Sequence, residues 1–266
     1  MTKQNLNVTL IQTDLVWENA AKNRAHLEHH LAQVTDSDLI VLPEMFTTGF
    51  SMQPQTIAET MDGPSVRWMK AQAAAKGCAV VGSLIISENQ RFYNRLLWVN
   101  ADGSVAQYDK KHLFTFAQED NEYTAGHAPL IVGFNGWKIA TFVCYDLRFP
   151  VWSRNSGLRA NQYDAAIYIA SWPARRALHW RTLLQARGIE NQSYIIGVNR
   201  VGQDGNQLDY HGDSMLIDPL GDTLLHEQGH EAVKTVTLSL AHVRDVRERF
   251  PFLKDADPFL LSDCVK

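Results

Sequence analysis

The feature that most constrains the fold is an alternation of strand-like and helix-like segments that β-hairpins interrupt. Buried-strand patterns occupy residues 38–43 and 164–170, while residues 64–76 are typical of a helix that Pro opens and Gly77 closes. An Asn-Gly turn at 135–136 lies between two apolar runs and predicts a hairpin. Hairpins do not fit a purely parallel, doubly wound sheet. Two mixed β-sheets packed face to face, with helices outside, fit better.

The remaining predicted elements follow the same rhythm. No low-complexity segment or Pro/Ser-rich linker divides the chain, so residues 1–266 are predicted to form one domain. Further strands are predicted at 6–12, 78–87, 92–100, 105–109, 130–134 and 137–143, with three or four β-rich segments between 194 and 238. Further helices are predicted around Leu27, Leu31 and Val34, and at 148–157, 176–192 and 240–250.

Composition and charge restrict the possible partners. With 45% hydrophobic and 20% charged residues, the chain has the composition of a globular protein. A net charge of −4 gives no indication of a basic surface that would bind nucleic acid or an anionic membrane. The apolar stretches are too short to span a bilayer, and the N-terminal residues are predicted to form a strand rather than a signal peptide.

The cysteines indicate the compartment. Cys78, Cys144 and Cys264 form an odd set without a CxxC motif, which indicates a reducing compartment and no disulfide framework. We therefore expect a cytoplasmic protein. Cys78 lies inside an apolar strand and is interpreted as a small buried hydrophobe, and Cys264 in the tail receives no role.

Cys144 is the first candidate for chemistry. It follows the apolar run at 139–143 and precedes the polar cluster at 145–148. A cysteine at the C-terminal end of a strand can present its sulfur in a crevice near free backbone N–H groups. The alternative is that Cys144, like most free cysteines, packs as a buried hydrophobe.

Glu44 and Lys110 are the second and third candidates. Glu44 ends the buried run at 38–43, where a desolvated carboxylate needs a partner or a role. Lys110 follows the predicted strand at 105–109. The alternatives are an ordinary ion pair or a hydrated carboxylate for Glu44, and solvated surface charge for Lys110.

Together these three residues define a workable chemistry. Hydrolysis of an amide by a thiol needs a base, a donor for the tetrahedral oxyanion and an acid for departing ammonia. Glu44, Lys110 and Cys144 can supply those roles from three separate strand ends. A thiolate beside an ammonium is favoured electrostatically, so we expect Lys110 to lower the pKa of Cys144.

The same residues carry a resemblance to the nitrilase superfamily of carbon–nitrogen hydrolases. The sequence is similar to that family in LPEMF around Glu44, YDKKHLF around Lys110 and CYDLRFP around Cys144. Two further blocks, WPARRALHW at 172–180 and RGIENQ at 187–192, extend the similarity over nearly the whole chain. The resemblance implies a four-layer αββα sandwich that pairs into a homodimer, and it implies no metal and no organic cofactor.

The resemblance also assigns a second carboxylate and a substrate class. The family carboxylate stands seven residues before a glycine, which here indicates Glu119 before Gly126, with Glu122 as the competitor. Within the superfamily the chain most resembles bacterial omega-amidases, which hydrolyse 2-oxoglutaramate to 2-oxoglutarate and ammonia. A small-molecule amide is therefore the expected substrate. Aliphatic nitrilases, N-carbamoyl amino acid hydrolases, aliphatic amidases and amide-forming relatives are the alternatives, since they share this catalytic set.

The predicted substrate pocket rests on residues near these motifs. We expect the oxyanion to lie between Lys110 and the backbone N–H of Tyr145. Either Arg175 or Arg176, just after the strand at 164–170, could bind a substrate carboxylate, although Arg176 could instead open the following helix. Four aromatic residues could form the pocket wall, with core packing as the alternative: Phe46, Phe50, Phe114 and Trp172.

Other enzyme classes fit the sequence less well. HEQGH at 226–230 matches the zinc-protease motif HExxH, but its flanks are β-patterned and Gly229 interrupts it, so a hairpin loop is the better interpretation. His26, His29 and His30 are interpreted as the solvated flank of a helix, and no metal site is predicted. A papain-like enzyme would draw on His112, His127, His179 or His211, and a non-enzymatic binding protein would not need the Glu, Lys and Cys set.

Overall fold

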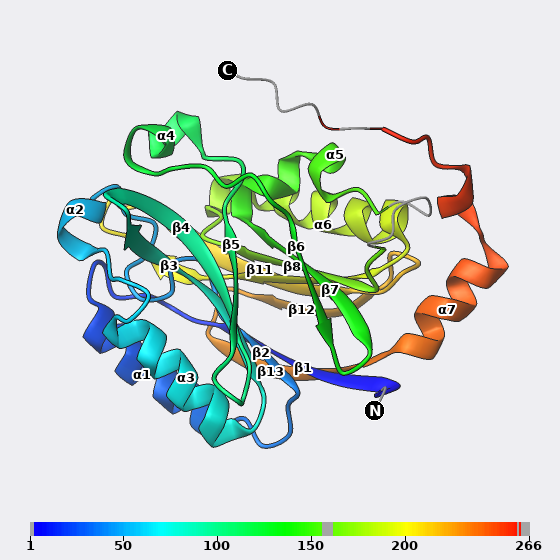
Figure 1. Cartoon of the computed structure of the whole chain (residues 1–266), viewed down its shortest axis with the longest axis horizontal. Helices are drawn as coiled ribbons and strands as arrows, with labels where there is room; N and C mark the ends of the chain where they lie inside the picture. Colours follow the sequence, from blue (N-terminus) through cyan, green and yellow to red (C-terminus); the bar gives the residue numbers. More distant parts are fainter. Residues whose placement is uncertain (1–2, 156–161, 260, 262–266) are drawn as a thin grey trace.

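The computed structural model describes residues 3–155, 162–259 and 261 and contains two mixed β-sheets flanked by helices (Figure 1). In the first sheet the strand order is β13-β1-β2-β3-β4-β5. β2 pairs in parallel with β1 and β3, and the other neighbours are antiparallel. The strands of this sheet are β1 Asn5–Gln12, β2 Leu39–Val41, β3 Ala79–Glu88, β4 Arg91–Val99, β5 Val105–Asp109 and β13 Ala232–Ser239.

The second sheet repeats this plan, with a parallel centre and antiparallel edges. Its order is β10-β11-β9-β8-β7-β6, with β12 paired to β11, and β7, β8 and β9 are parallel. The strands are β6 Leu130–Phe134, β7 Trp137–Val143, β8 Ala165–Ala170, β9 Tyr194–Asn199, β10 Val201–Gln203, β11 Asp209–Ile217 and β12 Thr223–Gln228. Both sheets are mixed, as the hairpins in the sequence predicted.

Helices cover the outer faces of the two sheets. α1 and α3 lie against the first sheet, and α6 lies against the second (Figure 1). The α-helices are α1 Ala20–Ala32, α2 Pro54–Ile57, α3 Pro64–Lys76, α4 Glu119–Glu122, α5 Pro150–Ser153, α6 Ala177–Asn191 and α7 Leu240–Arg249. Short 3₁₀ segments are η1 Thr115–Ala117, η2 Cys144–Arg148, η3 Ala174–Arg176 and η4 Phe252–Asp255. No helix in the described part of the chain is long and apolar enough to cross a membrane.

Three hydrophobic cores separate the four layers. β8 shows how: Ile167 and Ile169 face the core between the sheets, whereas Ala166 and Tyr168 face the core beneath α6, which includes Leu184. This alternation is the two-residue period of a strand with both faces buried, and it explains why the run at 164–170 is apolar throughout. The αββα sandwich predicted from the sequence is confirmed.

Local signals also fixed several element ends. α3 spans Pro64–Lys76, and Gly77 caps it in the left-handed conformation, with φ of 64° and its N–H donated to Ala73 and Ala74. The predicted helix at 148–157 is wrong in extent. Only Pro150–Ser153 is α-helical, after the 3₁₀ turn Cys144–Arg148, and residues 156–157 lie outside the described residues. Pro150 explains the break, because the residue before a proline disfavours helical backbone.

Candidate active site

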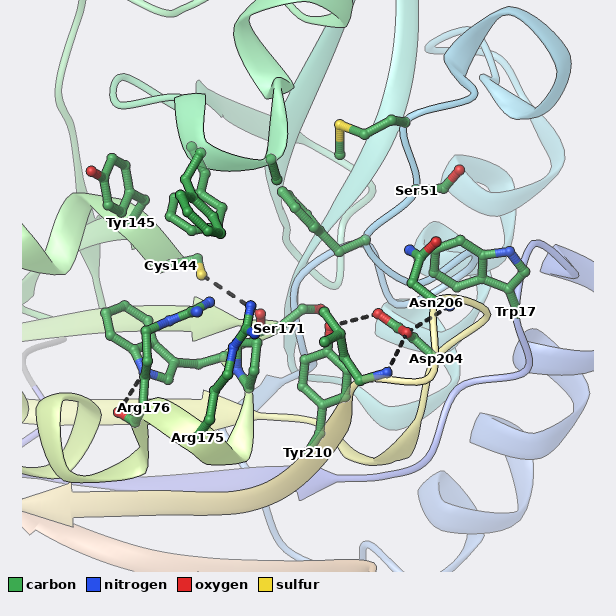
Figure 2. A pocket seen from close by; sticks show the side chains of 18 of the residues that line it. Trp17, Ser51, Cys144, Tyr145, Ser171, Arg175, Arg176, Asp204, Asn206 and Tyr210 are labelled. Atoms are coloured by element: carbon green, nitrogen blue, oxygen red, sulfur yellow. Dashed lines mark hydrogen bonds between the residues drawn. The ribbon is translucent and has the colours of Figure 1, made fainter.

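Cys144 stands where β7 ends and the chain turns into η2. Its φ is 46°, a left-handed conformation that is uncommon for a residue other than glycine. Such local strain persists only where surrounding contacts hold it, and it is found often at functional sites. The turn presents Sγ to a cavity, and the sulfur lies 4.0 Å from the carbonyl oxygen of Ser171 at the end of β8 (Figure 2).

Asp146 holds this turn in place. Its fully buried carboxylate accepts hydrogen bonds from the backbone N–H of Val143 (3.0 Å) and from the hydroxyl of Tyr108 (2.7 Å). The other oxygen accepts the backbone N–H of His112 at 3.0 Å and lies 2.7 Å from its Nδ1. One carboxylate therefore ties the cysteine turn to the loop that begins with Lys110.

Glu44 approaches from the first sheet, three residues beyond β2. Its side chain is fully buried, and Oε2 accepts the backbone N–H of Ser171 at 2.8 Å. The hydroxyl of Ser171 donates to the Glu44 carbonyl at 3.3 Å. Because Ser171 also contacts Cys144, the ends of β2, β7 and β8 meet at one point.

Lys110 lies between two buried carboxylates. Its Nζ donates to Glu44 Oε1 at 3.0 Å and to both oxygens of Glu119, at 3.0 and 2.9 Å. Asn94, in the middle of β4, donates from Nδ2 to Glu44 (2.8 Å) and to Glu119 (3.3 Å). All four side chains are buried, so the cluster is rigid and largely shielded from water.

The structure distinguishes Glu119 from its competitor. Glu119 is fully buried beside Lys110 and also accepts the backbone N–H of Phe114 at 2.6 Å. Glu122, one turn further along α4, accepts instead from Gln55 Nε2 at 2.6 Å, near the surface. Gly126 has a separate reason to be glycine, because a Cβ there would meet the Asp109 carbonyl oxygen at 2.1 Å.

Burial and charge set the pKa values of the cluster. Burial alone would lower the pKa of Lys110, but the carboxylates of Glu119 and Glu44 outweigh it and raise that pKa. Burial raises the pKa of Glu119, against the lowering effect of Lys110. The ammonium is therefore retained at neutral pH.

The expected low thiol pKa is wrong for the resting protein. Burial raises the pKa of Cys144 well above its ordinary value, and the charge of Glu44 and a hydrogen bond with it raise it further. Lys110 acts in the opposite direction but does not compensate. Cys144 is thus a thiol in the resting protein, with the Glu44 carboxylate beside it.

A cavity of about 540 Å³ opens in front of Cys144 (Figure 2). Its walls include Phe50, Phe114 and Trp172, as predicted from the sequence, and also Tyr145, which was predicted only as a backbone N–H donor. The prediction that Phe46 lines the pocket is wrong. Its ring is fully buried in the core of the first sheet, 5.8 Å from the ring of Trp68, because it fills the space above Gly82.

Both candidate arginines line this cavity. In Figure 2 the side chains of Arg175 and Arg176 extend from the turn after β8 toward the space beside Cys144. The Arg176 guanidinium lies 5.3 Å from the centre of the Phe114 ring, and its backbone carbonyl accepts the Trp172 indole N–H at 2.8 Å. Arg176 therefore contributes to the structure through its backbone and leaves its charge facing the cavity.

Several cavity and cluster residues were missed by sequence reasoning. Asn94 had a usable signal, because it is an isolated amide inside an otherwise buried strand. Arg148, whose guanidinium lies 4.6 Å from the Trp172 ring centre, sits in the block around Cys144. The remaining cavity residues carry no such signal, and they include Trp17, Glu18, Ser51, Asp204 and Asn206 from loops and Tyr210 from the start of β11.

The histidine-based alternatives do not match the geometry. His226 lies in β12, so HEQGH is not helical, and its Nε2 is 2.8 Å from an Asp213 oxygen. The ring of His112 is engaged with Asp146, and that of His179 with Arg148 at 3.1 Å. These three rings are therefore already held by other side chains.

Comparisons with known proteins agree with this geometry. The carbon-nitrogen hydrolase family matches residues 7–248. Omega-amidase YafV of Escherichia coli K12 is 46% identical over 257 residues, which cover 96% of this chain and 98% of that protein. 2-Oxoglutaramate amidase of Bacillus subtilis is 29% identical over 252 residues, covering 93% of this chain and 96% of that protein.

A solved structure agrees with the fold closely. XC1258 from Xanthomonas campestris is a CN-hydrolase superfamily protein whose crystal structure carries an arsenic adduct in the active site. It superposes with a TM-score of 0.95 at 44% identity, and the match covers 98% of this chain and 100% of that one. The chain described here belongs to the carbon–nitrogen hydrolase family.

Proposed function

We propose that this protein is an omega-amidase, which hydrolyses the terminal amide of 2-oxoglutaramate or a similar 2-oxo acid amide through a thioester on Cys144. The proposal rests on one observation: Cys144, Glu44 and Lys110 lie together beside a cavity that two arginines also line. The similarity to omega-amidase YafV and to 2-oxoglutaramate amidase supports the same substrate class.

In the first half of the proposed reaction, Glu44 takes the Cys144 proton as Sγ attacks the amide carbon. Because burial keeps the thiol protonated, proton removal and attack are coupled, and no free thiolate accumulates. The oxyanion is stabilised by Lys110 and by the backbone N–H of Tyr145. Glu44 then gives its proton to the departing nitrogen, so ammonia leaves and the acyl group stays on sulfur.

In the second half, water replaces ammonia. Glu44 removes a proton from water, the oxygen attacks the thioester carbon, and Lys110 again stabilises the oxyanion. Collapse of this intermediate releases the carboxylic acid, and the sulfur regains its proton from Glu44. Glu119 and Asn94 take no proton in this scheme: they fix Lys110 and Glu44 through the hydrogen bonds described above.

We assign the binding of the substrate's distal carboxylate to Arg175 or Arg176. A 2-oxo acid amide carries a carboxylate that needs hydrogen-bond donors when it enters a mostly apolar cavity. A guanidinium can bind a carboxylate with two parallel hydrogen bonds. Arg175 and Arg176 line the same cavity as Cys144, so either one could hold the distal carboxylate while the amide reaches the sulfur.

Ammonia release across a substrate panel tests the assignment. The panel contains 2-oxoglutaramate, glutamine, asparagine, butyramide, an aliphatic nitrile and an N-carbamoyl amino acid. We expect 2-oxoglutaramate to give the highest kcat/KM, because it alone combines a terminal amide with a 2-oxo acid. A preference for the nitrile or the carbamoyl compound would contradict the omega-amidase proposal and leave the family assignment intact.

Replacing the arginines tests the carboxylate contact. Arg175→Gln and Arg176→Gln remove the charge and shorten the side chain but keep a hydrogen-bond donor. At least one of them should lower kcat/KM for 2-oxoglutaramate by about 10- to 100-fold, the range for a charge-assisted hydrogen bond of about 1.5–3 kcal/mol. Butyramide has no carboxylate and serves as the matched control, so its kcat/KM should change little. Parallel losses for both substrates, or no loss for either, would remove these arginines from substrate recognition.

A further inference from the structure

A second cluster of polar side chains lies outside the active site, where α1 meets the connection between β12 and β13. His26 and His30 stand four residues apart on α1, on one face of the helix. The antiparallel pairing of β1 with β13 places Ala232 opposite Gln12, so Glu231 lies beside Thr13 at the end of β1. The interpretation of these histidines as a solvated flank is wrong for His30, which is 7% exposed.

The ligand atoms of this cluster converge on one point. His26 Nε2 lies 2.7 Å from Glu231 Oε1 and 3.2 Å from His30 Nε2, and His30 Nε2 lies 3.6 Å from Glu231 Oε1. Zinc binds imidazole nitrogen and carboxylate oxygen at about 2.0–2.2 Å, and a tetrahedron of that size has edges of about 3.3–3.6 Å. The separations of 3.2 and 3.6 Å are close to such an edge, whereas the 2.7 Å between His26 and Glu231 is a hydrogen-bond distance that must lengthen by about 0.6 Å when an ion binds. Thr13 Oγ1 lies beside these atoms, 3.0 Å from both His30 Nε2 and Glu231 Oε1.

Neighbouring groups fix the ligand atoms of His30 and Glu231 in position. His30 is buried, and its Nε2 also lies 3.0 Å from Thr13 Oγ1, so the position of its ring is fixed. The hydrogen bonds to Glu231 Oε1 from the Asp14 N–H (2.9 Å) and Thr13 (3.0 Å) fix the position of this ligand atom.

We propose that His26, His30 and Glu231 form a binding site for a divalent transition-metal ion of the zinc class. Among the residues that the structure describes, these three have ligand atoms that all lie within 4.8 Å of one another. The side chains of His26 and Glu231 are 38% and 37% exposed, so an ion can enter from solvent and a water molecule can complete the coordination. The bound ion would tie α1 to the connection between β12 and β13, which makes the site structural.

The proposed ligands differ from the zinc motif in the sequence. HEQGH at 226–230 looked like a helical zinc motif but ends a β-strand. The helical histidine pair with the same four-residue spacing is His26 and His30, and the residue directly after HEQGH, Glu231, completes the set. The set is separate from Cys144, Glu44 and Lys110, so the proposal does not depend on the proposed function.

Zinc titration of the full-length protein tests the site. The parent protein carries Cys144→Ala, so that zinc cannot bind the active-site thiol, and it has no polyhistidine tag. Isothermal titration calorimetry should give one zinc ion per chain, and zinc should raise the melting temperature. His26→Ala and Glu231→Gln in this background should weaken binding by about tenfold or more, since even outer-sphere partners of a metal ligand matter on that scale. Both positions are partly exposed, so the fold should tolerate them.

His29→Ala is the matched control, because His29 is an exposed histidine on the same helix whose ring nitrogen contacts the Ala25 carbonyl. It should bind zinc as the parent does. Circular dichroism without zinc must match the parent for each variant; if His26→Ala fails this check, His26→Gln replaces it. Absence of saturable binding in the parent would overturn the proposal. Undiminished binding in His26→Ala and Glu231→Gln, or an equal loss in His29→Ala, would also overturn it.

Discussion

Replacing Cys144 by Ala is expected to lower kcat to the background rate while leaving the fold intact. Removing the nucleophile of a hydrolase that works through a covalent intermediate costs about 10⁶-fold in kcat. The side chain is small and lies at the cavity edge, so the substitution removes one sulfur without disturbing the buried cluster behind it. Ammonia release from 2-oxoglutaramate, measured at high enzyme concentration, gives the residual rate, and thermal melting checks the fold.

Cys78→Ala is the control for this prediction. Cys78 is 3% exposed in the core beneath α1 and α3, and burial raises the pKa of its thiol to about 11, so it is inert at neutral pH. Its replacement should lower stability slightly and leave kcat nearly unchanged. Substantial turnover by the Cys144→Ala protein would contradict covalent catalysis, whatever the behaviour of the control.

Lys110→Ala is the second variant with a large expected effect. Loss of one oxyanion donor costs about 10²–10³ in kcat. Here the loss should be at least that large, because the ammonium also offsets the charges of Glu44 and Glu119, which would otherwise repel each other in a buried site. Steady-state kinetics should show the defect in kcat more than in KM, since the donor acts mainly on the transition state.

The neighbouring lysine supplies the matched control. Lys111 Nζ lies 5.4 Å from the ring centre of Trp152, on the far side of the loop from the carboxylate cluster. Lys111→Ala should therefore change kcat by less than about threefold, the scale of a surface interaction worth about 0.5 kcal/mol. Equal defects in the two variants would show that Lys110 has been given the wrong role.

Most of the fold could be predicted because strong local patterns mark it. The run at 164–170 is apolar at every position since both faces of β8 are buried, and the Pro64 and Gly77 signals mark the two ends of α3. The segment at 148–157 failed because a period-based argument cannot separate a short 3₁₀ turn and a four-residue helix from one longer helix. The homodimer that the resemblance implies stays a prediction.

Glu44, Lys110 and Cys144 could be predicted because each follows the end of a strand. Glu44 and Lys110 follow strands of the first sheet and Cys144 follows β7 of the second, and the packing of the two sheets brings them together. Asn94 was missed although it bridges Glu44 and Glu119, since its role depends on a contact between two strand regions far apart in sequence. Trp17 and Tyr210 were missed for the same reason: nothing near them in the sequence indicates that the loop of Trp17 and the start of β11 reach the cavity.

Two predictions were wrong, the low pKa of Cys144 and the place of Phe46 in the pocket wall. The expectation of a low pKa for Cys144 considered the attraction of Lys110 but left out the cost of burying a thiolate. In the structure this burial cost is the larger effect. Phe46 lies close to Glu44 in sequence, but the turn after β2 sends its ring into the core and not into the cavity. Sequence proximity to a motif does not fix the direction of a side chain.

The central claim is that the acyl group of the substrate is carried by the sulfur of Cys144, and trapping that intermediate tests it most directly. Enzyme mixed with 2-oxoglutaramate is quenched in acid within the first turnover and analysed by intact-mass and peptide mass spectrometry. The account predicts a mass increase equal to the substrate minus ammonia, located on the peptide that contains Cys144 and removed by hydroxylamine. Full turnover with no such adduct in the first turnover, or an adduct on another residue, would contradict it.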